Sequence, residues 1–334
     1  MGAKVTMRKV SVMSVKKNIL SGLLKFVLAS VAIVSIFLFS LYGSGIALHF
    51  AMVGLTGAIL ALGLNIFYGY CGQINFGSAG FFAIGGYGVA LLEKYMHMPY
   101  FLSLILSVAV AGLIALLMTL PLLRLREYML ALGTLAFGLA IYETVSKGFT
   151  SYTGGEDGIN MSKLKIFGTP VGDTFFFYVF LIATLLCLWV SYALRNSRTG
   201  RAMVSISQDE IAATSLGVNI NKYLVQAFVL SGIIPALAGG LFVKWTGWCS
   251  PEYFSLKNSI LILLAVVGGG TGSGIGAAMG GVIMFLLQEI LVPLAIYEML
   301  AYGVILCMFL LFMPRGIKSG ITSFVKWLEG VGGR

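Results

Sequence analysis

Residues 195–223 read RNSRTGRAMVSISQDEIAATSLGVNINKY and form the longest polar, basic interval between two apolar runs beyond residue 25. Small and apolar residues recur within this interval at spacings that suit a short amphipathic helix. Gly217 follows the pattern, and glycine often ends a helix because it tolerates a left-handed conformation. Such a loop is either a solvated connection that only orients the chain or a docking element for a cytoplasmic partner.

The composition around this loop is that of a membrane protein. The chain has 334 residues, 59% of them hydrophobic and 10% charged, and its mean hydropathy is +0.97. Soluble globular domains of this length do not have such a composition, so we expect an all-α polytopic membrane protein. The net charge of +10 follows the ends of the apolar runs, which relates it to membrane topology rather than to nucleic acid. The four cysteines show no metal-ligand spacing.

About ten transmembrane helices can be drawn, each of about 20 residues. Residues 1–25 are basic and contain no acid, which predicts a cytoplasmic N-terminus before an uncleaved first span. The membrane domain covers 26–317 and the cytoplasmic tail 318–334, with an external loop at 147–173 and a cytoplasmic loop at 195–223. Most lysines and arginines then lie on the cytoplasmic side, and Lys244 is among those left outside. The predicted spans are 26–47, 46–68, 78–95, 100–123, 128–147, 174–194, 224–244, 258–274, 276–296 and 298–313.

Residues that could carry catalysis are scarce. The chain has two histidines and lacks HExxH, GxSxG and paired carboxylates at helical spacing, so we expect no catalytic residues, no metal site and no cofactor in this chain. The glycine-rich run 268–281 lacks the lysine of a phosphate-binding loop. Its glycines at four-residue spacing instead predict one packing ridge on a helix. These ridge residues are Gly268, Gly272, Gly276 and Gly280.

Acidic residues inside the spans are scarce too. Glu289 is the one that looks clearly internal, and Glu143 lies near an outer end. Ion-coupled secondary transporters usually keep acids or histidines at membrane depth, so the energy for transport would come from elsewhere.

Residues 65–87, NIFYGYCGQINFGSAGFFAIGGY, interrupt two apolar runs with glycines and amide side chains. Non-helical backbone at membrane depth is tolerated where protein buries it or where it lines a wet cavity. Amides and hydroxyls there could contact a zwitterionic solute, which makes Asn65, Gln73, Asn75 and Ser78 candidate translocation-pathway residues. A plain short loop between spans is the alternative.

The motif GYCGQINFGSAGFF at 69–82 with IGGY at 84–87 resembles the signature of the permease family of branched-chain amino acid ABC importers, and in particular of its LivM-type subunits. Further matches follow in the same order along about residues 50–317. They are LRLR at 123–126, TLAF at 134–137, TGGEDG at 153–158, SRTGR at 197–201, DEIAA at 209–213, LG at 216–217, SPE at 250–252, the glycine run at 267–276 and FMPRG at 312–316.

The resemblance implies a multi-pass subunit of a prokaryotic inner membrane. It would pair with a second, LivH-type permease, with two ATP-binding cassette subunits that bind ATP and magnesium, and with an extracytoplasmic solute-binding protein. Residues 209–217 resemble the coupling helix that sits in a groove of the ATPase. The residues expected to contact the ATPase are Arg201, Ser205, Asp209, Glu210, Ala213 and Gly217.

Three positions depart from the family pattern. Ser78 stands where histidine is frequent, Asn75 where serine is frequent, and Ile211 separates Glu210 from the following alanines. The first two bear on the substrate, because relatives of this family carry urea and other amides. The expected function is therefore import of branched-chain or other hydrophobic amino acids. A urea or amide permease, or an ion-coupled secondary transporter, is the alternative.

Overall fold

The structure, a computed structural model, describes residues 45–122, 127–162, 164–166, 169–291 and 303–304. Its contacts divide the chain into two units, Met1–Leu48 and His49–Arg334. Residues 45–48 are the described part of the first unit, so the packing below belongs to the second. The predicted N-terminal region 1–25, nearly all of the first and last predicted spans, and the tail 318–334 lie outside the described residues.

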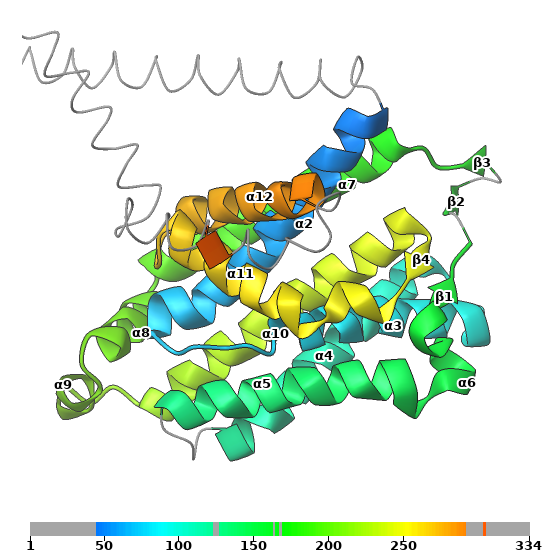
Figure 1. Ribbon diagram of the computed structural model, residues 1–334. Helices are drawn as coiled ribbons and strands as arrows, with labels where there is room; N and C mark the ends of the chain where they lie inside the picture. The colour runs from blue at the N-terminus through cyan, green and yellow to red at the C-terminus, as the bar shows by residue number, and fades with distance from the viewer. Residues whose placement is uncertain (1–44, 123–126, 163, 167–168, 292–302, 305–334) are drawn as a thin grey trace, which may run out of the picture. The chain divides into compact units, whose positions relative to one another are not determined.

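Long apolar helices make up most of the described chain (Figure 1). Within the described residues, six helical stretches are long and apolar enough to cross a membrane, which confirms a polytopic helical membrane protein. The span count of ten and the orientation of the termini remain predictions. The long helices are α2 (Gly45–Leu64), α3 (Ser78–Met96), α4 (Tyr100–Leu122), α5 (Glu127–Glu143), α7 (Asp173–Asn196), α10 (Ile220–Thr246), α11 (Leu256–Gly269) and α12 (Gly274–Leu291).

Two of these helices continue into π-helical turns. Helix α2 continues into η1 (Asn65–Tyr70), and α5 into η2 (Thr144–Gly148). The predicted spans from 46–68 to 224–244 agree with helices to within a few residues. Helix α11 ends at Gly269 and is shorter than the predicted span 258–274.

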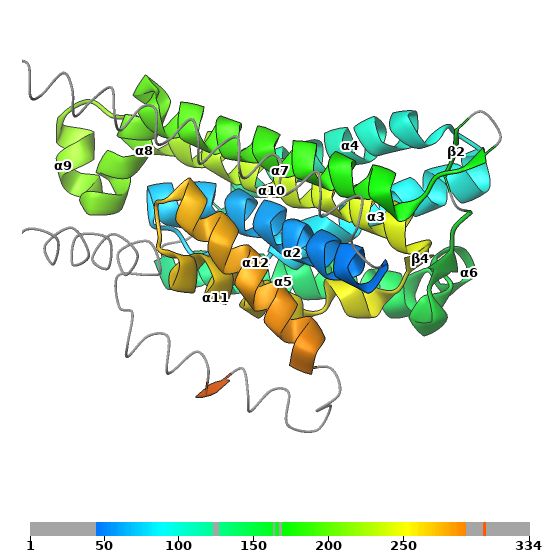
Figure 2. The same cartoon turned by 90° about the horizontal axis from the view of Figure 1, so that it is seen from above.

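Helix α10 packs against α3 and α4, and α3 also contacts α5. Glycines allow close approaches: a Cβ added at Gly85 of α3 would collide with the Ala236 carbonyl of α10. Figure 2 shows α2 and α12 side by side, and an added Cβ at Gly57 or Gly281 would collide with the other's carbonyl oxygen. Small residues at helix contacts are typical of membrane proteins, where close packing replaces the hydrophobic drive of water.

Helix α4 shows how polarity is distributed between the two sides of such a helix. Its buried residues are small or hydroxylated and recur every four positions, as at Ser103, Ser107 and Ala111. Its exposed residues include the large apolar side chains Ile105 and Leu120. An apolar outer face suits contact with lipid or with another membrane subunit.

The glycine ridge predicted on one helix was wrong. Helix α11 ends at Gly269, the chain turns through 270–273, and α12 begins at Gly274. Gly272 lies in this turn with φ of +73°, a conformation that favours glycine. Gly268 therefore lies on α11, while Gly276 and Gly280 lie on α12. An added Cβ at Gly280 would collide with the Ala265 carbonyl of α11, so it lies at the contact between the two helices.

Short elements connect the helices at the C-terminal end of α10. After α6 (Thr150–Thr153) and η3 (Gly155–Asp157), β1 (Ile159–Asn160) pairs antiparallel with β4 (Trp248–Cys249), which follows α10. Strands β2 (Lys165–Ile166) and β3 (Thr169–Pro170) form a second pair, and η4 (Pro251–Phe254) follows β4. Gly154, Gly155 and Gly158 have positive φ, a conformation that favours glycine and suits the tight turns of this region. The predicted external loop 147–173 is thus attached to the chain beyond α10.

The loop 195–223 contains two helices, α8 (Arg198–Gln208) and α9 (Glu210–Ser215), rather than the single amphipathic helix expected. Asp209 separates them in an extended conformation, with φ of −163° and ψ of 112°. Helix α9 ends as predicted, because Gly217 adopts φ of +82° shortly after its last residue.

Candidate functional site

Side-chain caps fix the two helices of the loop 195–223. The Ser197 hydroxyl accepts a hydrogen bond from the Gly200 amide at 3.1 Å and so begins α8. The Asp209 carboxylate accepts bonds from the amides of Ile211 and Ala212 at 2.8 and 2.9 Å and so begins α9. Asp209 therefore acts as a helix cap.

Helix α9 has an inner and an outer side. Ala213 is buried, whereas Ile211 and Leu216 are 81% and 83% exposed. Exposed apolar side chains at the tip of a polar loop are typical of protein contact surfaces. Ile211 and Leu216 were not among the predicted coupling residues, although Ile211 was noted as a departure from the family pattern.

The other predicted coupling residues lie on the surface or bond within α8. Arg201 is exposed, and its guanidinium donates to the Asn196 carbonyl at 2.9 Å. The half-buried Ser205 donates its hydroxyl hydrogen to the Ala202 carbonyl at 2.8 Å. Gly217 is exposed, and nothing lies within 4 Å of where its Cβ would be.

Residues 72–77 form a non-helical segment between η1 and α3. Asn75 is fully buried, and its side-chain oxygen Oδ1 accepts a hydrogen bond from the Gly77 amide at 2.7 Å. The Phe76 amide donates to the Thr134 hydroxyl of α5 at 3.1 Å. In the described part of the chain, the Asn75 amide nitrogen and the Ser78 hydroxyl are buried without a hydrogen-bond partner. Residues of this kind often mark functional sites, because an unmet buried polar group is costly.

One hydrogen bond joins this segment to the loop 195–223. The Gln73 amide nitrogen donates to the Glu210 carboxylate at 3.0 Å, across 137 positions of sequence. Two cavities, of about 800 and about 560 Å³, are lined by both residues. The larger also involves α4, α5 and α10, and the smaller lies between residues 71–74 and 206–211. The structure thus brings together one residue expected in the pathway and one expected at the ATPase.

Asn65 lies elsewhere. Its carbonyl oxygen accepts the Gly272 amide at 3.0 Å and so holds the turn between α11 and α12. Its amide nitrogen has no partner among the described residues. Asn65 is completely buried, and it lines neither of the two cavities beside Gln73.

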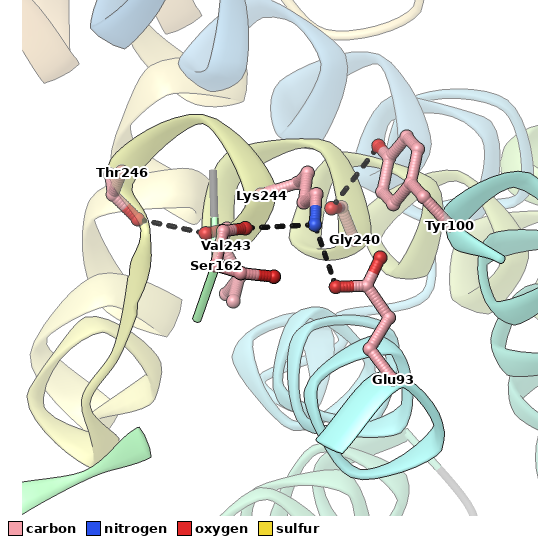
Figure 3. Close-up of polar contacts among 7 residues, drawn as sticks. All are labelled: Glu93, Tyr100, Ser162, Gly240, Val243, Lys244 and Thr246. Atoms are coloured by element: carbon pink, nitrogen blue, oxygen red, sulfur yellow. Dashed lines mark hydrogen bonds and ion pairs between the residues drawn. The ribbon is translucent and has the colours of Figure 1, made fainter. Parts of the chain in front are cut away.

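The C-terminal end of α10 carries a buried ion pair that the sequence analysis missed (Figure 3). Lys244 is 4% exposed and contacts the Glu93 carboxylate of α3 at 2.7 Å. Its ammonium group also donates to the Ser162 carbonyl at 3.0 Å and lies 5.5 Å from the centroid of the Tyr100 ring. Lys244 therefore joins α10, α3, α4 and the chain just after β1. Glu289 lies in α12, a candidate membrane span, as expected, but it is not the one internal charge, because Lys244 and Glu93 are buried more deeply.

Glu289 is partly exposed instead. Its carboxylate lies 3.1 Å from the His49 ring, and their side chains are 36% and 47% exposed. Among the described residues, no three histidine, cysteine, aspartate or glutamate side chains come together as metal ligands.

Comparison with known proteins identifies the family. The profile of the family described as branched-chain amino acid transport system / permease component matches residues 46–313. The high-affinity branched-chain amino acid transport system permease protein LivM of Salmonella typhimurium is 32% identical over 297 residues, which cover 81% of this chain and 70% of the relative. LivM of Escherichia coli is 31% identical over the same shares of the two chains.

LivH of Salmonella typhimurium, a permease protein of the same kind of system, is 26% identical over 288 residues, 79% of this chain and 92% of the relative. The resemblance carried by residues 69–87 is thereby confirmed along most of the chain. The chain belongs to the permease family of branched-chain amino acid transport systems.

Proposed function

We propose that this chain is the transmembrane permease subunit of an ATP-driven importer for branched-chain or other hydrophobic amino acids, and that it forms the translocation pathway with a second, LivH-type permease subunit. The printed names of its LivM and LivH relatives support the cargo class. The observation that carries the proposal is the capped α8–α9 loop with its exposed Ile211 and Leu216, set between two long apolar helices.

The loop 195–223 faces the cytoplasm in this proposal, and the β1–β4 pair faces the outside. The arginines at 195, 198 and 201 support this orientation, since basic residues concentrate in cytoplasmic loops. ATP and magnesium bind to two partner ATPases, and a solute-binding protein delivers cargo from outside. The chain itself then needs no catalytic residue and no nucleotide site.

The coupling works by displacement of α9. Closure of the ATPases around ATP moves the tip formed by Ile211 and Leu216, and the spans rock to change access to the pathway. Arg201, Asp209 and Gly217 lie on the exposed side of the loop and complete the ATPase contact. Ala213 is buried, and it acts by seating α9 on the membrane domain.

Purification from native membranes in mild detergent tests this proposal. We expect a second polytopic subunit and two nucleotide-binding ATPases to purify with the chain, and the vesicle-reconstituted complex to import leucine only with ATP. Leu216→Asp should remove the ATPases, because a charge at an apolar contact is costly. Leu216→Met is the matched control and should retain them. A chain that purifies alone and imports solute without ATP would contradict the proposal, and urea uptake in place of leucine would correct the cargo.

A further inference from the structure

The exposed Glu210 forms its side-chain bond with its own chain. It is the first residue of α9, and its carboxylate accepts the hydrogen bond from Gln73 at 3.0 Å. The other side-chain hydrogen bonds described for α9 stay within the loop: Asp209 caps the helix, and Thr214 and Ser215 donate to the carbonyls of Glu210 and Ile211. The apolar tip, by contrast, faces away from the protein.

The segment that Gln73 belongs to has free space at its Gln73 end. Two cavities, of about 800 and about 560 Å³, both include Gln73 and Glu210 in their walls. Gly72 begins the segment with φ of +75°, so the chain leaves helical geometry at this point. A displacement of α9 can therefore be taken up around residues 72–74, which are exposed or half-buried, with little disturbance of packed side chains.

The segment also leads directly to the centre of the membrane domain. Its last residue, Gly77, precedes the first turn of α3, which packs along α10. Asn75 and Ser78, each with one buried polar atom that has no hydrogen-bond partner among the described residues, lie in and next to it. Buried polar atoms without partners cost free energy in this conformation, so another conformation that supplied partners would recover that cost.

We propose that Gln73 is a positioning residue that transmits the displacement of α9 to residues 72–77 and α3 through its hydrogen bond to Glu210. The inference rests on the proposed function. It also revises the role of Glu210, which acts as the internal end of the coupling element instead of a contact for the ATPase.

The donor and acceptor of this bond can be exchanged. Gln73→Glu places two carboxylates side by side and breaks the bond by repulsion. Glu210→Gln keeps it, because the amide oxygen still accepts from Gln73. The double variant Gln73→Glu/Glu210→Gln restores one amide and one carboxylate with the direction of the bond reversed. Asn221→Asp makes the same amide-to-acid change in the wall of the larger cavity and is the matched control.

The movement can be measured without knowledge of the cargo. Ile74→Cys introduces a thiol into the wall of the smaller cavity. The probe is a maleimide, and its rate of reaction is compared with and without ATP plus vanadate in the purified permease–ATPase complex in nanodiscs. The chain without Ile74→Cys is measured alongside and gives the background labelling of the native cysteines. The amount of ATPase that co-purifies shows whether each variant still assembles into the complex.

We expect ATP plus vanadate to change the labelling rate in the parent, in Glu210→Gln and in Asn221→Asp. In Gln73→Glu the change should fall by about fivefold or more, the size of a typical coupling between sites, with assembly retained. The double variant should recover it. A full response in Gln73→Glu, a double variant no better than Gln73→Glu, or a parent whose assembled complex shows no response would each overturn the inference. A parent that brings down no ATPase would overturn the proposed function instead.

Discussion

The surroundings of the two ends of α10 differ in chemistry. At its C-terminal end, Lys244 is almost fully buried and bonds to a carboxylate, a backbone carbonyl and the face of an aromatic ring. Near its N-terminal end, the neighbouring helix α9 is linked to residues 72–77, among the described residues, by one side-chain hydrogen bond between Gln73 and the exposed Glu210, beside two cavities.

This contrast assigns a different mobility to each end. A desolvated charge cannot lose its partners without a large cost, so the Lys244 end keeps one arrangement. A hydrogen bond open to water exchanges with solvent at small net cost, so the Gln73 end can change. A membrane domain that is fixed near one end of α10 and loosely linked to α9 near the other suits a transporter whose signal arrives through α9.

Lys244→Met should have the largest effect, because it leaves the Glu93 carboxylate largely buried and unpaired. Breaking a buried pair in this way costs about 3–5 kcal/mol. The measurement is the midpoint of thermal unfolding of the detergent-purified complex. Lys244→Met/Glu93→Gln removes both charges and should be clearly more stable than Lys244→Met alone. Equal midpoints for wild type and Lys244→Met would show that the two ends do not differ in this way.

Gly85→Ala should have the next largest effect on stability. It lies in the contact between α3 and α10, which runs between the two ends of α10. The added methyl group would collide with the Ala236 carbonyl, so α3 and α10 must separate. Overpacking of this kind costs about 1–3 kcal/mol. The same unfolding measurement applies, with Gly172→Ala as control because nothing lies within 4 Å of its Cβ position. An unchanged midpoint for Gly85→Ala would mean that α3 and α10 can separate freely.

The sequence predicted the two partners of the Gln73–Glu210 contact separately. Its polar, basic composition located the loop 195–223, periodicity predicted a helix in it that ends at Gly217, and the polar residues at 65–78 drew attention to Gln73 and Asn75. It did not predict their contact, because residues separated by 137 positions carry no pairing signal in one sequence. The break at Asp209 was missed, since an aspartate within a helical pattern shows its capping role only when its backbone is extended.

The sequence analysis missed the buried ion pair of Lys244 for a related reason. Lys244 follows an apolar run, and a lysine there usually extends its charge to water, so it was assigned to the outside. Only tertiary packing shows that Glu93, on another helix, pairs with it. The prediction of a glycine ridge on one helix was wrong although the sequence contained the opposing signal. The run GGGTGSG has more turn-forming residues than a helix tolerates, but the prediction followed the four-residue spacing of its glycines.

Asp209→Ala tests the loose end with a smaller effect. Loss of this cap costs α9 about 0.5–2 kcal/mol, because two backbone amides lose their acceptor. We expect the thermal midpoint of the membrane domain to change little and the yield of co-purified ATPase to fall. Asp209→Asn keeps a capping oxygen and is the matched control. If Asp209→Ala retained ATPase as well as the control, a formed α9 would not be needed for docking.

Native cysteines give the smallest and most direct comparison of the two ends. Cys71 lies just before residues 72–77, and Cys249 lies in β4 beyond Lys244. Burial raises the pKa of Cys71 to about 12 and also raises the pKa of Cys249. The thiolate is the reactive form, so a raised pKa leaves little of it at neutral pH, and both should react slowly with maleimide in the resting complex. ATP plus vanadate should accelerate labelling of Cys71 and leave Cys249 protected, as mass spectrometry of the labelled peptides would show. Equal acceleration at both cysteines would mean that the end held by Lys244 opens together with the other, and the contrast in chemistry would then have no counterpart in motion.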